Sequence, residues 1–298
     1  MKILCNCSGT ESRDPALIKH NGKYYWTCSI NDRIYVKESM DVAGFENSEA
    51  KLVWTPDEER YAHELWAPEL QVIDGVCYIY VACDDGENRN HRMYVLSNGS
   101  DNPLDPYKMI GKITDSTDKW AIDGTIFRHK TGMYFLWSGW EGDENIAQNI
   151  YIAKMKSPTE ISSERVMISR PEHAWEKMGG TGTTDGLPFI NEGPYAFREG
   201  DRTFVAYSAA GSWCTDYCIA LLELVGDDPL DATAWKKQSS PIISKNDDFM
   251  GMGHCSVIEE DKLVFFHGWS IDEKDVVWHT VHPIYATYRL DGETLVIE

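Results

Sequence analysis

The chain has 298 residues, of which 42% are hydrophobic and 12% are aromatic, and its formal net charge is −20 at pH 7. This hydrophobic fraction is large enough to build a core, which excludes a globally disordered chain. The acidic balance argues against a nucleic-acid partner and against an anionic membrane surface, because both need clustered Lys and Arg side chains. A neutral ligand is the class of partner that remains.

The N-terminal residues 1–7 contain one basic residue and two aliphatic ones. A signal peptide needs an apolar stretch of about 7–15 residues, and a membrane-spanning helix needs about 20. Neither pattern occurs, so we expect a cytoplasmic protein with no membrane partner, unless a leader has been removed. The eight cysteines do not have the spacing of zinc ligands, and we expect them to be reduced and largely buried, as in the apolar runs around Cys28 and Cys77.

Five repeats follow one another along the chain. Each repeat has a polar or aromatic residue, a turn residue seven to nine positions later, and then an aromatic, apolar run typical of a β-strand. In chain order, these strand-like runs are residues 22–26, 75–80, 132–137, 200–205 and 261–266. A second strand-like run follows in each repeat, at residues 33–36, 92–96, 149–153, 217–221 and 284–288. No long apolar stripe of helical period competes with these strands.

The repeat length indicates the fold. Turn residues of successive repeats lie 53 to 68 positions apart, and sheet units repeated at such a step are typical of a β-propeller, whose blades surround a central channel. We therefore predict an all-β, five-bladed β-propeller. It forms a single domain over residues 1–298, with blades that begin near residues 14, 66, 123, 192 and 254. An all-β sandwich with accidental similarity between segments is the alternative.

The repeats also predict a site. Equivalent positions of successive blades lie at one height around the channel, so Asp14, Trp66, Asp123, Glu192 and His254 are expected to meet at one of its mouths. Three converging carboxylates disfavour joint ionisation, so at least one pKa should rise, which separates a general acid from a general base. Two such groups suffice to hydrolyse a glycosidic bond. Taken alone, each carboxylate would be typical of a turn or loop.

The chain resembles glycoside hydrolase family 43 at five motifs, which occur in order between about residue 13 and residue 290. The motifs are Arg13-Asp14-Pro15, Trp66-Ala67-Pro68-Glu69, Ile122-Asp123-Gly124, Asn191-Glu192-Gly193-Pro194 and Gly251-Met252-Gly253-His254. The resemblance implies a five-bladed propeller and an inverting glycosidase of plant polysaccharides or their fragments. Two departures stand out: Met252 occupies a position where the family commonly has proline, and the glycine-rich residues 179–186 resemble an inserted loop.

The resemblance also implies a role for each residue of the predicted site. Asp14 is similar to the general base, Glu192 to the general acid, and Asp123 to the carboxylate that orients the acid and raises its pKa. Inversion places the acid and base carboxyl groups about 6.5–9.5 Å apart, with room for a water. Trp66 is similar to a tryptophan that stacks on the substrate, with a core tryptophan as the alternative. His63 is expected to face the same pocket.

His254 has two interpretations. The family often carries calcium on the channel axis near this histidine, bound directly or through water. Calcium prefers oxygen ligands, so we expect mostly water around such an ion. The alternative is a hydrogen-bonded histidine with no metal. We expect the chemistry itself to require no cofactor.

The substrate is inferred from further resemblance. Segments of exo-acting α-L-arabinofuranosidases in the family resemble residues 32–35, 92–96, 169–172 with 175–176, and 207–210 with 216–218. We therefore expect release of terminal α-L-arabinofuranosyl residues from arabinoxylo- or arabino-oligosaccharides, which are neutral and contain pentoses. β-Xylosidase and endo-arabinanase activities are the alternatives within the family. A non-catalytic carbohydrate-binding propeller and a protein-interaction propeller are alternatives of another class.

Overall fold

The computed structural model describes residues 1–5, 12–179, 186–274, 276, 280–292 and 294–298. Within these ranges the regular structure consists of β-strands and 3₁₀ helices of three to five residues. No helix in the described part of the chain is long and apolar enough to cross a membrane. The prediction of an all-β protein is confirmed.

The first two sheets are four-stranded antiparallel meanders. The first contains β2 (Ala16–His20), β3 (Lys23–Ser29), β4 (Ile34–Ser39) and β5 (Lys51–Trp54). The second contains β6 (His63–Ile73), β7 (Val76–Asp84), β8 (Arg92–Ser97) and β9 (Lys108–Lys112). Their connections include the 3₁₀ helices η1 (Ala43–Asn47), η2 (Glu59–Tyr61) and η3 (Asn88–Asn90). Strands that are consecutive in sequence are therefore also neighbours in space.

The next sheet joins two further meanders into nine strands. The first meander contains β10 (Ala121–His129), β11 (Gly132–Gly139), β12 (Ala147–Ser157), β13 (Glu160–Ile161) and β14 (Val166–Ser169). The second contains β15 (Phe189–Glu199), β16 (Arg202–Ala209), β17 (Cys218–Leu224) and β18 (Trp235–Lys237), with η4 (Ala174–Lys177) and η5 (Ala232–Ala234) in the connections. A short parallel pairing of Ala147 with Phe189 and of Gln148 with Ile190 joins the two meanders.

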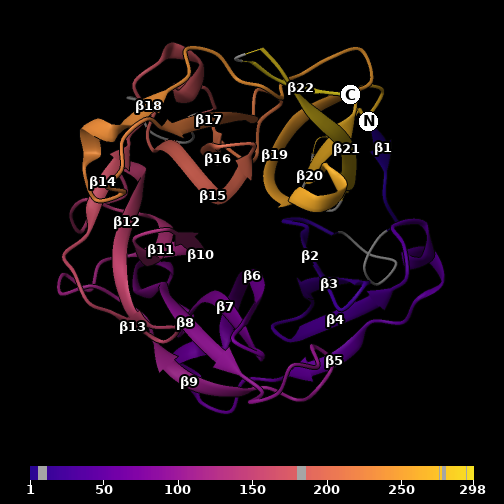
Figure 1. Cartoon of the computed structure of the whole chain (residues 1–298), viewed down its shortest axis with the longest axis vertical. Coiled ribbons are helices and arrows are strands. Elements are labelled where there is room, and N and C mark those ends of the chain that lie inside the picture. The colour runs from indigo at the N-terminus through magenta and orange to yellow at the C-terminus, as the bar shows by residue number, and fades with distance from the viewer. Residues whose placement is uncertain (6–11, 180–185, 275, 277–279, 293) are drawn as a thin grey trace.

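The last sheet brings the two ends of the chain together. It contains β19 (Phe249–Ile258), β20 (Leu263–Ser270), β21 (His282–Asp291) and β22 (Thr294–Ile297), with η6 (Glu259–Asp261) between the first two. The N-terminal β1 (Lys2–Ile3) pairs with β21, Lys2 opposite Tyr285 and Ile3 opposite Ile284. The start of the chain thus adds a strand to the sheet that its end forms, and both termini lie beside this sheet in Figure 1.

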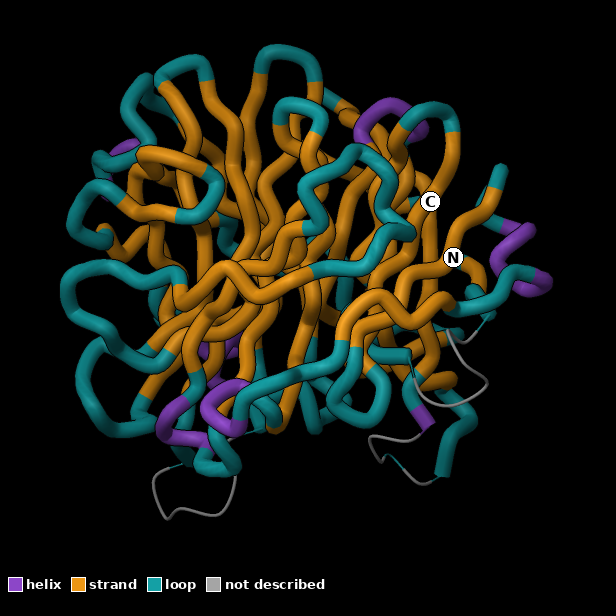
Figure 2. The backbone as a smooth tube through the Cα atoms, turned by 90° about the horizontal axis from the view of Figure 1, so that it is seen from below, coloured by secondary structure: helices purple, strands orange, loops and turns teal. Residues whose placement is uncertain are grey.

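The sheets are arranged around a common centre, with β2, β6, β10, β15 and β19 as the innermost strands (Figure 1). Seen from the side, the strands run between two faces on which loops and turns gather (Figure 2). A large hydrophobic cluster lies between each pair of neighbouring units, and its burial holds them together. Members of the five clusters include Val36 with Ile79, Tyr80 with Phe135, Leu136 with Tyr207, Phe204 with Phe266, and Trp26 with Phe265.

All ten strand-like runs predicted from the sequence overlap observed strands. The residue that begins each repeat lies in or just before the innermost strand of its unit. Asp14 precedes β2, Trp66 lies in β6, Asp123 in β10, Glu192 in β15 and His254 in β19. The repeat therefore places these five residues at the innermost strands of five different units, four within the strand and Asp14 just before it.

The cysteines only partly follow the expectation of reduced thiols. Free thiols occur at Cys5, Cys77, Cys83, Cys214, Cys218 and Cys255. Cys28, which is buried in β3, is disulfide-bonded. The expectation is wrong for this residue, because it was argued from the compartment and not from the position of Cys28 beside other parts of the chain.

Candidate active site

A cavity of about 230 Å³ lies where the innermost strands approach one another. Asp14, Trp66, Asp123, Glu192 and His254 all line it. The other lining residues are Asn88, Trp120, Ile122, Asn145, Gln148, Pro188, Ser212, Trp213 and His267. The fold thus brings together the five residues for which the repeats predict a shared position.

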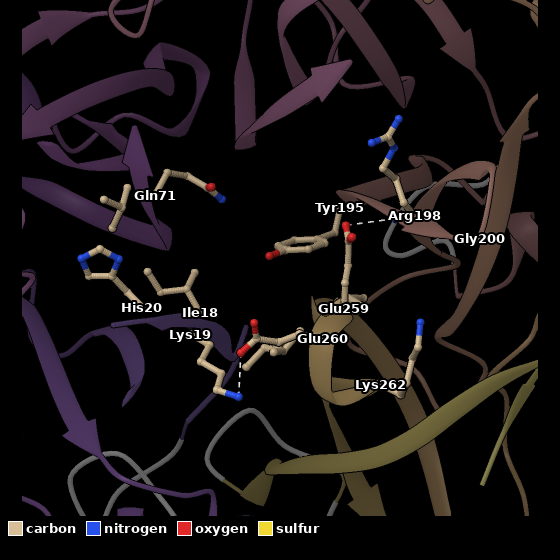
Figure 3. Close-up of a pocket in the computed structure, with 13 residues that line it drawn as sticks. Ile18, Lys19, His20, Gln71, Tyr195, Arg198, Gly200, Glu259, Glu260 and Lys262 are labelled. Carbon is tan, nitrogen blue, oxygen red and sulfur yellow. Dashed lines mark hydrogen bonds and ion pairs between the residues drawn. The ribbon is translucent and has the colours of Figure 1, made fainter. Parts of the chain in front are cut away.

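A larger cavity of about 900 Å³ lies at the opposite ends of these strands. Lys19, Gln71, Tyr195 and Glu259 contribute to its wall from β2, β6, β15 and η6 (Figure 3). Two of its charged groups pair with each other, in the contact of 2.6 Å between Lys19 Nζ and the Glu260 carboxylate. No predicted site residue is among the described residues that line it, so the smaller cavity is the candidate active site.

The backbone departs from regular strand geometry at the smaller cavity. Asp14, Ala67, Asp123, Gly193 and His254 have φ between +44° and +56°. Strand register shifts at or beside these positions in β6, β10, β15 and β19, which marks β-bulges. A bulge bends its strand and re-aims a side chain. Such backbone costs about 1–3 kcal/mol at a non-glycine residue and clusters at functional sites, where the surrounding structure enforces it.

The Asp14 carboxylate lies between two histidines. Its Oδ1 is 3.3 Å from His254 Nδ1 and 3.2 Å from His267 Nδ1, and the Asp14 N–H also donates to His267 Nδ1 at 3.1 Å. Burial acts to raise the pKa of Asp14, but the charge of His254 and the polar contact with His267 outweigh burial and lower the pKa well below its usual range. Asp14 is therefore ionised, which is the state that can accept a proton from water.

Glu192 is held in the opposite protonation state. It is 7% exposed, and the Tyr217 hydroxyl donates a hydrogen bond to its Oε1 at 2.8 Å. Burial and the negative charge of Asp123 raise the pKa of Glu192 to about 8, although Tyr217 and His254 act to lower it. Glu192 therefore keeps its proton at neutral pH and can donate it to a leaving oxygen.

Asp123 connects the strands on either side of the acid. Its Oδ2 accepts a hydrogen bond from the Gly193 N–H at 2.9 Å and lies 4.0 Å from His254 Nδ1. Burial raises the pKa of Asp123 to about 6, even though His254 acts to lower it. Burial alone would lower the pKa of His254, but the charges of Asp14 and Asp123 raise it to about 9. His254 is thus a cation that bridges the carboxylates electrostatically.

Two glycines allow the strands to approach this closely. A Cβ at Gly193 would lie 3.1 Å from His254 Nδ1, and its φ of +56° already favours glycine. A Cβ at Gly253 would lie 1.9 Å from the Tyr217 ring. The His254 N–H also donates to Ser208 Oγ at 2.6 Å. The packing therefore leaves no room for a Cβ at Gly253, and a Cβ at Gly193 would require His254 to shift by a few tenths of an ångström.

The two predicted substrate-binding residues have different outcomes. Trp66 is half-buried, lines the cavity and packs partly against a hydrophobic cluster, so its position fits both roles considered for it, and sugar stacking stays a prediction. His63 does not line the cavity. Its Nε2 lies 2.7 Å from the Glu59 carboxylate, and 40% of its side chain is exposed. The expectation that His63 faces the pocket is therefore corrected: its side chain turns to the Glu59 carboxylate and to solvent instead.

The residues around His254 do not form a metal centre by themselves. Among the described residues there is no group of three or more His, Cys, Asp or Glu side chains arranged to hold a metal ion. His254 Nδ1 is turned toward Asp14 and Asp123, which leaves this nitrogen unsuited to bind a cation. Calcium near His254 would depend on water for its oxygen ligands, and it stays a prediction.

Some residues at the site had no assigned role in the sequence argument. Tyr217 is 1% exposed and stacks on His267, with ring centroids 5.6 Å apart. Tyr217 belongs to a segment that resembles the family, and His267 directly follows an apolar strand-like run, where a histidine is an unusual residue to bury. That polar residue at the end of an apolar run is the signal that could have identified His267. Trp120 and Trp213 also line the cavity.

The two departures from the family motifs lie in different surroundings. Residues 180–185, the centre of the glycine-rich stretch considered as an inserted loop, lie outside the described residues. Met252 is fully buried in β19 and belongs to the cluster between the last two units. The residue in place of proline is therefore part of the core.

Comparison with known proteins is consistent with this architecture. The family model of glycosyl hydrolases family 43 matches residues 8–280. Two curated relatives are both named extracellular exo-alpha-(1->5)-L-arabinofuranosidase. The one from Streptomyces chartreusis is 29% identical over 83% of this chain and 76% of its own length. The one from Streptomyces avermitilis is 31% identical over 83% of this chain and 52% of its own length, so the chain spans about half of that relative.

Solved structures are also similar to the chain. The α-L-arabinofuranosidase from Lactobacillus brevis has a TM-score of 0.84 and 26% identity, covering 97% of this chain and 93% of that one. A thermostable family-43 glycoside hydrolase has a TM-score of 0.79 and 22% identity, covering 100% of this chain and 96% of that one, and supports the fold alone. Because the family model matches most of its length, the chain belongs to glycosyl hydrolases family 43, a family of glycosidases.

Proposed function

We propose that the chain is an inverting α-L-arabinofuranosidase that releases terminal α-L-arabinofuranosyl residues from arabinoxylo- or arabino-oligosaccharides. The main supporting observation is the opposite pKa shift of two carboxyl groups in one cavity. The pKa of Asp14 is lowered, while that of Glu192 is raised to about 8. At neutral pH a base and an acid are therefore both in their working protonation states.

The proposed reaction is a single displacement. Asp14 accepts a proton from a water while the water oxygen forms a bond to the anomeric carbon. Glu192 donates its proton to the glycosidic oxygen as the bond from that oxygen to the anomeric carbon breaks. Attack on the opposite side from the leaving group inverts the anomeric configuration, and we expect the two carboxyl groups to be about 6.5–9.5 Å apart. Solvent then returns Asp14 to its ionised form and Glu192 to its protonated form.

Asp123 acts on this reaction through Glu192. Its bond to the Gly193 N–H fixes the peptide next to the acid, and its charge helps to keep Glu192 protonated. Tyr217 acts later, because its hydroxyl can stabilise the carboxylate that forms when Glu192 gives up its proton. Asp123 thus supports the protonated form of Glu192, and Tyr217 the ionised form.

The size of the cavity supports action on a chain end. A volume of about 230 Å³ lies below the roughly 300–1,000 Å³ of typical ligand pockets, so it suits one sugar unit. Trp66 is the proposed stacking surface for this sugar. The names of the two Streptomyces relatives include both exo action and arabinofuranose, which favours these over the alternatives of β-xylosidase and endo-arabinanase.

We also infer that residues 1–298 form one closed, five-bladed propeller. Five innermost strands, a hydrophobic cluster between each pair of neighbouring units and the pairing of β1 with β21 support a ring. Hydrogen bonding groups the strands into four sheets, because the pairing of β12 with β15 joins the third and fourth units. A ring of this kind would hold Asp14 and His254 together although they lie at opposite ends of the chain.

The compartment and the metal remain predictions. The sequence favours the cytoplasm, but the disulfide at Cys28 and the word extracellular in the names of both relatives favour an oxidising compartment. A calcium ion near His254 would be bound mainly by water. The proton transfers of Asp14 and Glu192 do not involve it.

The test is a comparison of initial rates on 4-nitrophenyl α-L-arabinofuranoside and 4-nitrophenyl β-D-xyloside. Asp14→Ala, which removes the proposed base, serves as the inactive blank, and Glu199→Ala, at the far end of the strand that carries Glu192, is the control that should keep full activity. A preference for the arabinofuranoside supports the proposal. A preference for the xyloside would overturn the sugar but keep the mechanism. Binding of arabinose-containing oligosaccharides without hydrolysis would favour the carbohydrate-binding alternative.

A further inference from the structure

We propose that the buried pair of Asp84 and His91 positions Trp66, and that this pair thereby determines how tightly the sugar binds. The inference rests on the proposed function, because it takes Trp66 as the surface on which the sugar stacks. Neither Asp84 nor His91 lines the cavity. Both side chains are completely buried in the second unit, where neither the motifs nor the mechanism gives them a role.

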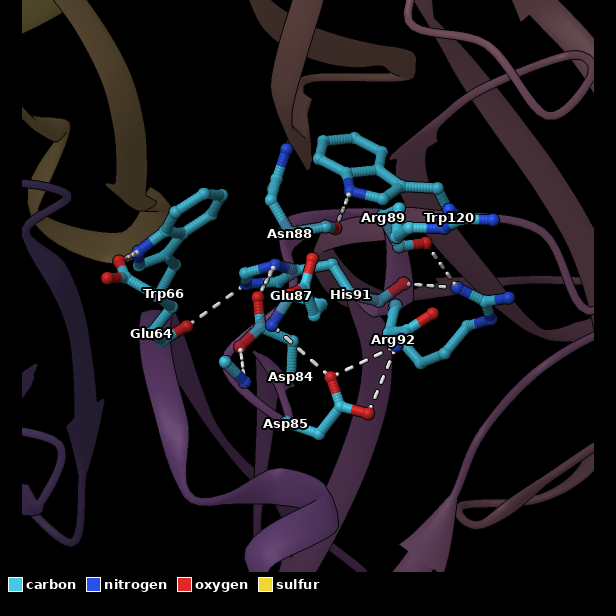
Figure 4. A network of polar contacts seen from close by, with 12 residues as sticks. Glu64, Trp66, Asp84, Asp85, Glu87, Asn88, Arg89, His91, Arg92 and Trp120 are labelled. Atoms are coloured by element: carbon cyan, nitrogen blue, oxygen red, sulfur yellow. Dashed lines mark hydrogen bonds and ion pairs between the residues drawn. The ribbon is translucent and has the colours of Figure 1, made fainter.

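His91 supports one face of Trp66. The two ring centroids are 4.1 Å apart and the ring planes differ by 24°, so the rings are stacked (Figure 4). His91 Nε2 lies 3.0 Å from the Glu64 carbonyl oxygen, and His91 Nδ1 lies 2.8 Å from Asp84 Oδ2. With both nitrogens engaged, the imidazole cannot turn without losing a polar contact. Trp66 therefore rests on a ring whose orientation is fixed.

The chemistry of these contacts locks the pair together. A carbonyl oxygen can only accept a hydrogen bond, so His91 Nε2 must carry a proton and donate it to Glu64. His91 Nδ1 lies 2.8 Å from Asp84 Oδ2, a contact of ion-pair length between two completely buried side chains. Asp84 is fixed in turn, since its Oδ1 accepts the Gly86 N–H at 2.8 Å. Separating the pair would leave buried polar groups without a partner, which is unfavourable.

The edge of Trp66 is held through the same neighbour. Its indole Nε1 donates to Glu64 Oε2 at 2.9 Å, while the Glu64 carbonyl accepts from His91. Glu64 has φ of +50° within the bulge of β6, which turns its side chain toward Trp66 and its carbonyl toward His91. Glu64 is exposed whereas His91 is buried, so His91 provides the contact that solvent does not weaken.

His91 also lies beside the second aromatic wall of the cavity. Its ring centroid is 6.1 Å from that of Trp120, whose Nε1 donates to the Asn88 carbonyl at 2.8 Å. Trp66, Trp120 and Asn88 all line the cavity. A displaced His91 would therefore disturb sugar binding, while Asp14 and Glu192 remain in place on other units.

The first test is the separation of KM from kcat in Asp84→Ala on 4-nitrophenyl α-L-arabinofuranoside. We expect KM to rise about 3- to 10-fold and kcat to stay within about twofold, because a stacking surface binds substrate and transition state alike. Asp84→Asn should keep a KM near that of the wild type, since its amide can donate to Nδ1 of a neutral His91. Asp115→Ala is the matched control: this buried carboxylate lies 3.6 Å from Arg165, outside the cavity, and should lower Tm without changing KM.

The second test places Asp84→Ala in a Trp66→Ala background. If the pair acts through Trp66, the second substitution adds no further increase in KM. An active Asp84→Ala with unchanged KM, or a KM that rises equally in both backgrounds, would overturn the inference alone. A wild-type chain that does not hydrolyse the substrate would overturn the proposed function and the inference with it. If Asp84→Ala does not fold, His91→Gln, which removes the stacked ring, takes its place, and its KM is compared in the wild-type and Trp66→Ala backgrounds.

Discussion

The hydrogen bond from the Tyr217 hydroxyl offers a specific test of Glu192 as the proposed acid. It donates to Glu192 Oε1 at 2.8 Å, whereas the ring stacks on His267 and packs against Gly253. Tyr217→Phe removes one oxygen and keeps the ring, so the packing around the site should survive. Any change in the behaviour of Glu192 then reports on the lost hydrogen bond.

The size of the effect follows from the two states of Glu192. A hydrogen bond to a charged group contributes about 1.5–3 kcal/mol and one between neutral groups about 0.5–1.5 kcal/mol. The bond therefore favours ionised Glu192 by about 1–1.5 kcal/mol, and one pKa unit corresponds to about 1.36 kcal/mol. Without the hydroxyl, the pKa of Glu192 should rise by about one unit from its value of about 8. Because the carboxylate forms as the proton is donated, kcat on oligosaccharides should fall about tenfold.

The assay is the pH dependence of kcat/KM, in which the alkaline limb reports the acid of the free enzyme. Tyr217→Phe should move this limb to higher pH. Tyr207→Phe is the matched control, since this buried tyrosine donates to Glu176 at 3.0 Å but lies outside the cavity. It should lower Tm and leave the limb in place. An alkaline limb that stays fixed or moves to lower pH in Tyr217→Phe would refute the reasoning.

Three further outcomes are expected. In the wild type, kcat/KM should fall above about pH 8, because Glu192 then loses its proton. At the acid side, kcat/KM should be retained to pH values below the usual pKa of an aspartate, because the pKa of Asp14 is lowered. An alkaline limb near pH 5 would contradict the assignment of Glu192 as the acid. Gly193→Ala should reduce kcat by roughly tenfold or more, since its Cβ would lie 3.1 Å from His254 and its backbone is left-handed. Unchanged steady-state rates would show that the site accommodates the added Cβ without displacing Glu192 or His254. Treatment with EDTA should leave kcat within about twofold, because the proton transfers use carboxyl groups alone; a larger loss, restored by calcium, would place a metal in the mechanism.

The strands and the shared position of the site could be predicted because both depend on local pattern and its repetition. Aromatic and β-branched runs after turn residues mark the strands, as in residues 132–137, which fall in β11. The repeat then assigns the same place in each unit to Asp14, Asp123 and Glu192, without knowledge of any contact. The repeat therefore predicted which residues lie close together in space although they are far apart in the sequence, which local propensity cannot do.

The parts that could not be predicted depend on contacts that a local sequence pattern does not specify. Tyr217 meets Glu192 only because β17 and β15 are brought together by β16, and its role has no sequence signal of its own. The direction of His63 could not be predicted, because which side chains of β6 face the cavity depends on where the two register shifts of this strand fall. The disulfide at Cys28 likewise depends on which segments lie side by side.

The most direct test of the central claim compares leaving groups in Glu192→Ala and Asp14→Ala. An activated aryl α-L-arabinofuranoside leaves without protonation, whereas an oligosaccharide needs an acid. The account predicts that Glu192→Ala loses hydrolysis of the oligosaccharide but retains much of its rate on the activated substrate, while Asp14→Ala loses both. The reverse pattern, or equal losses on both substrates in Glu192→Ala, would contradict the assignment of Glu192 as the acid and Asp14 as the base.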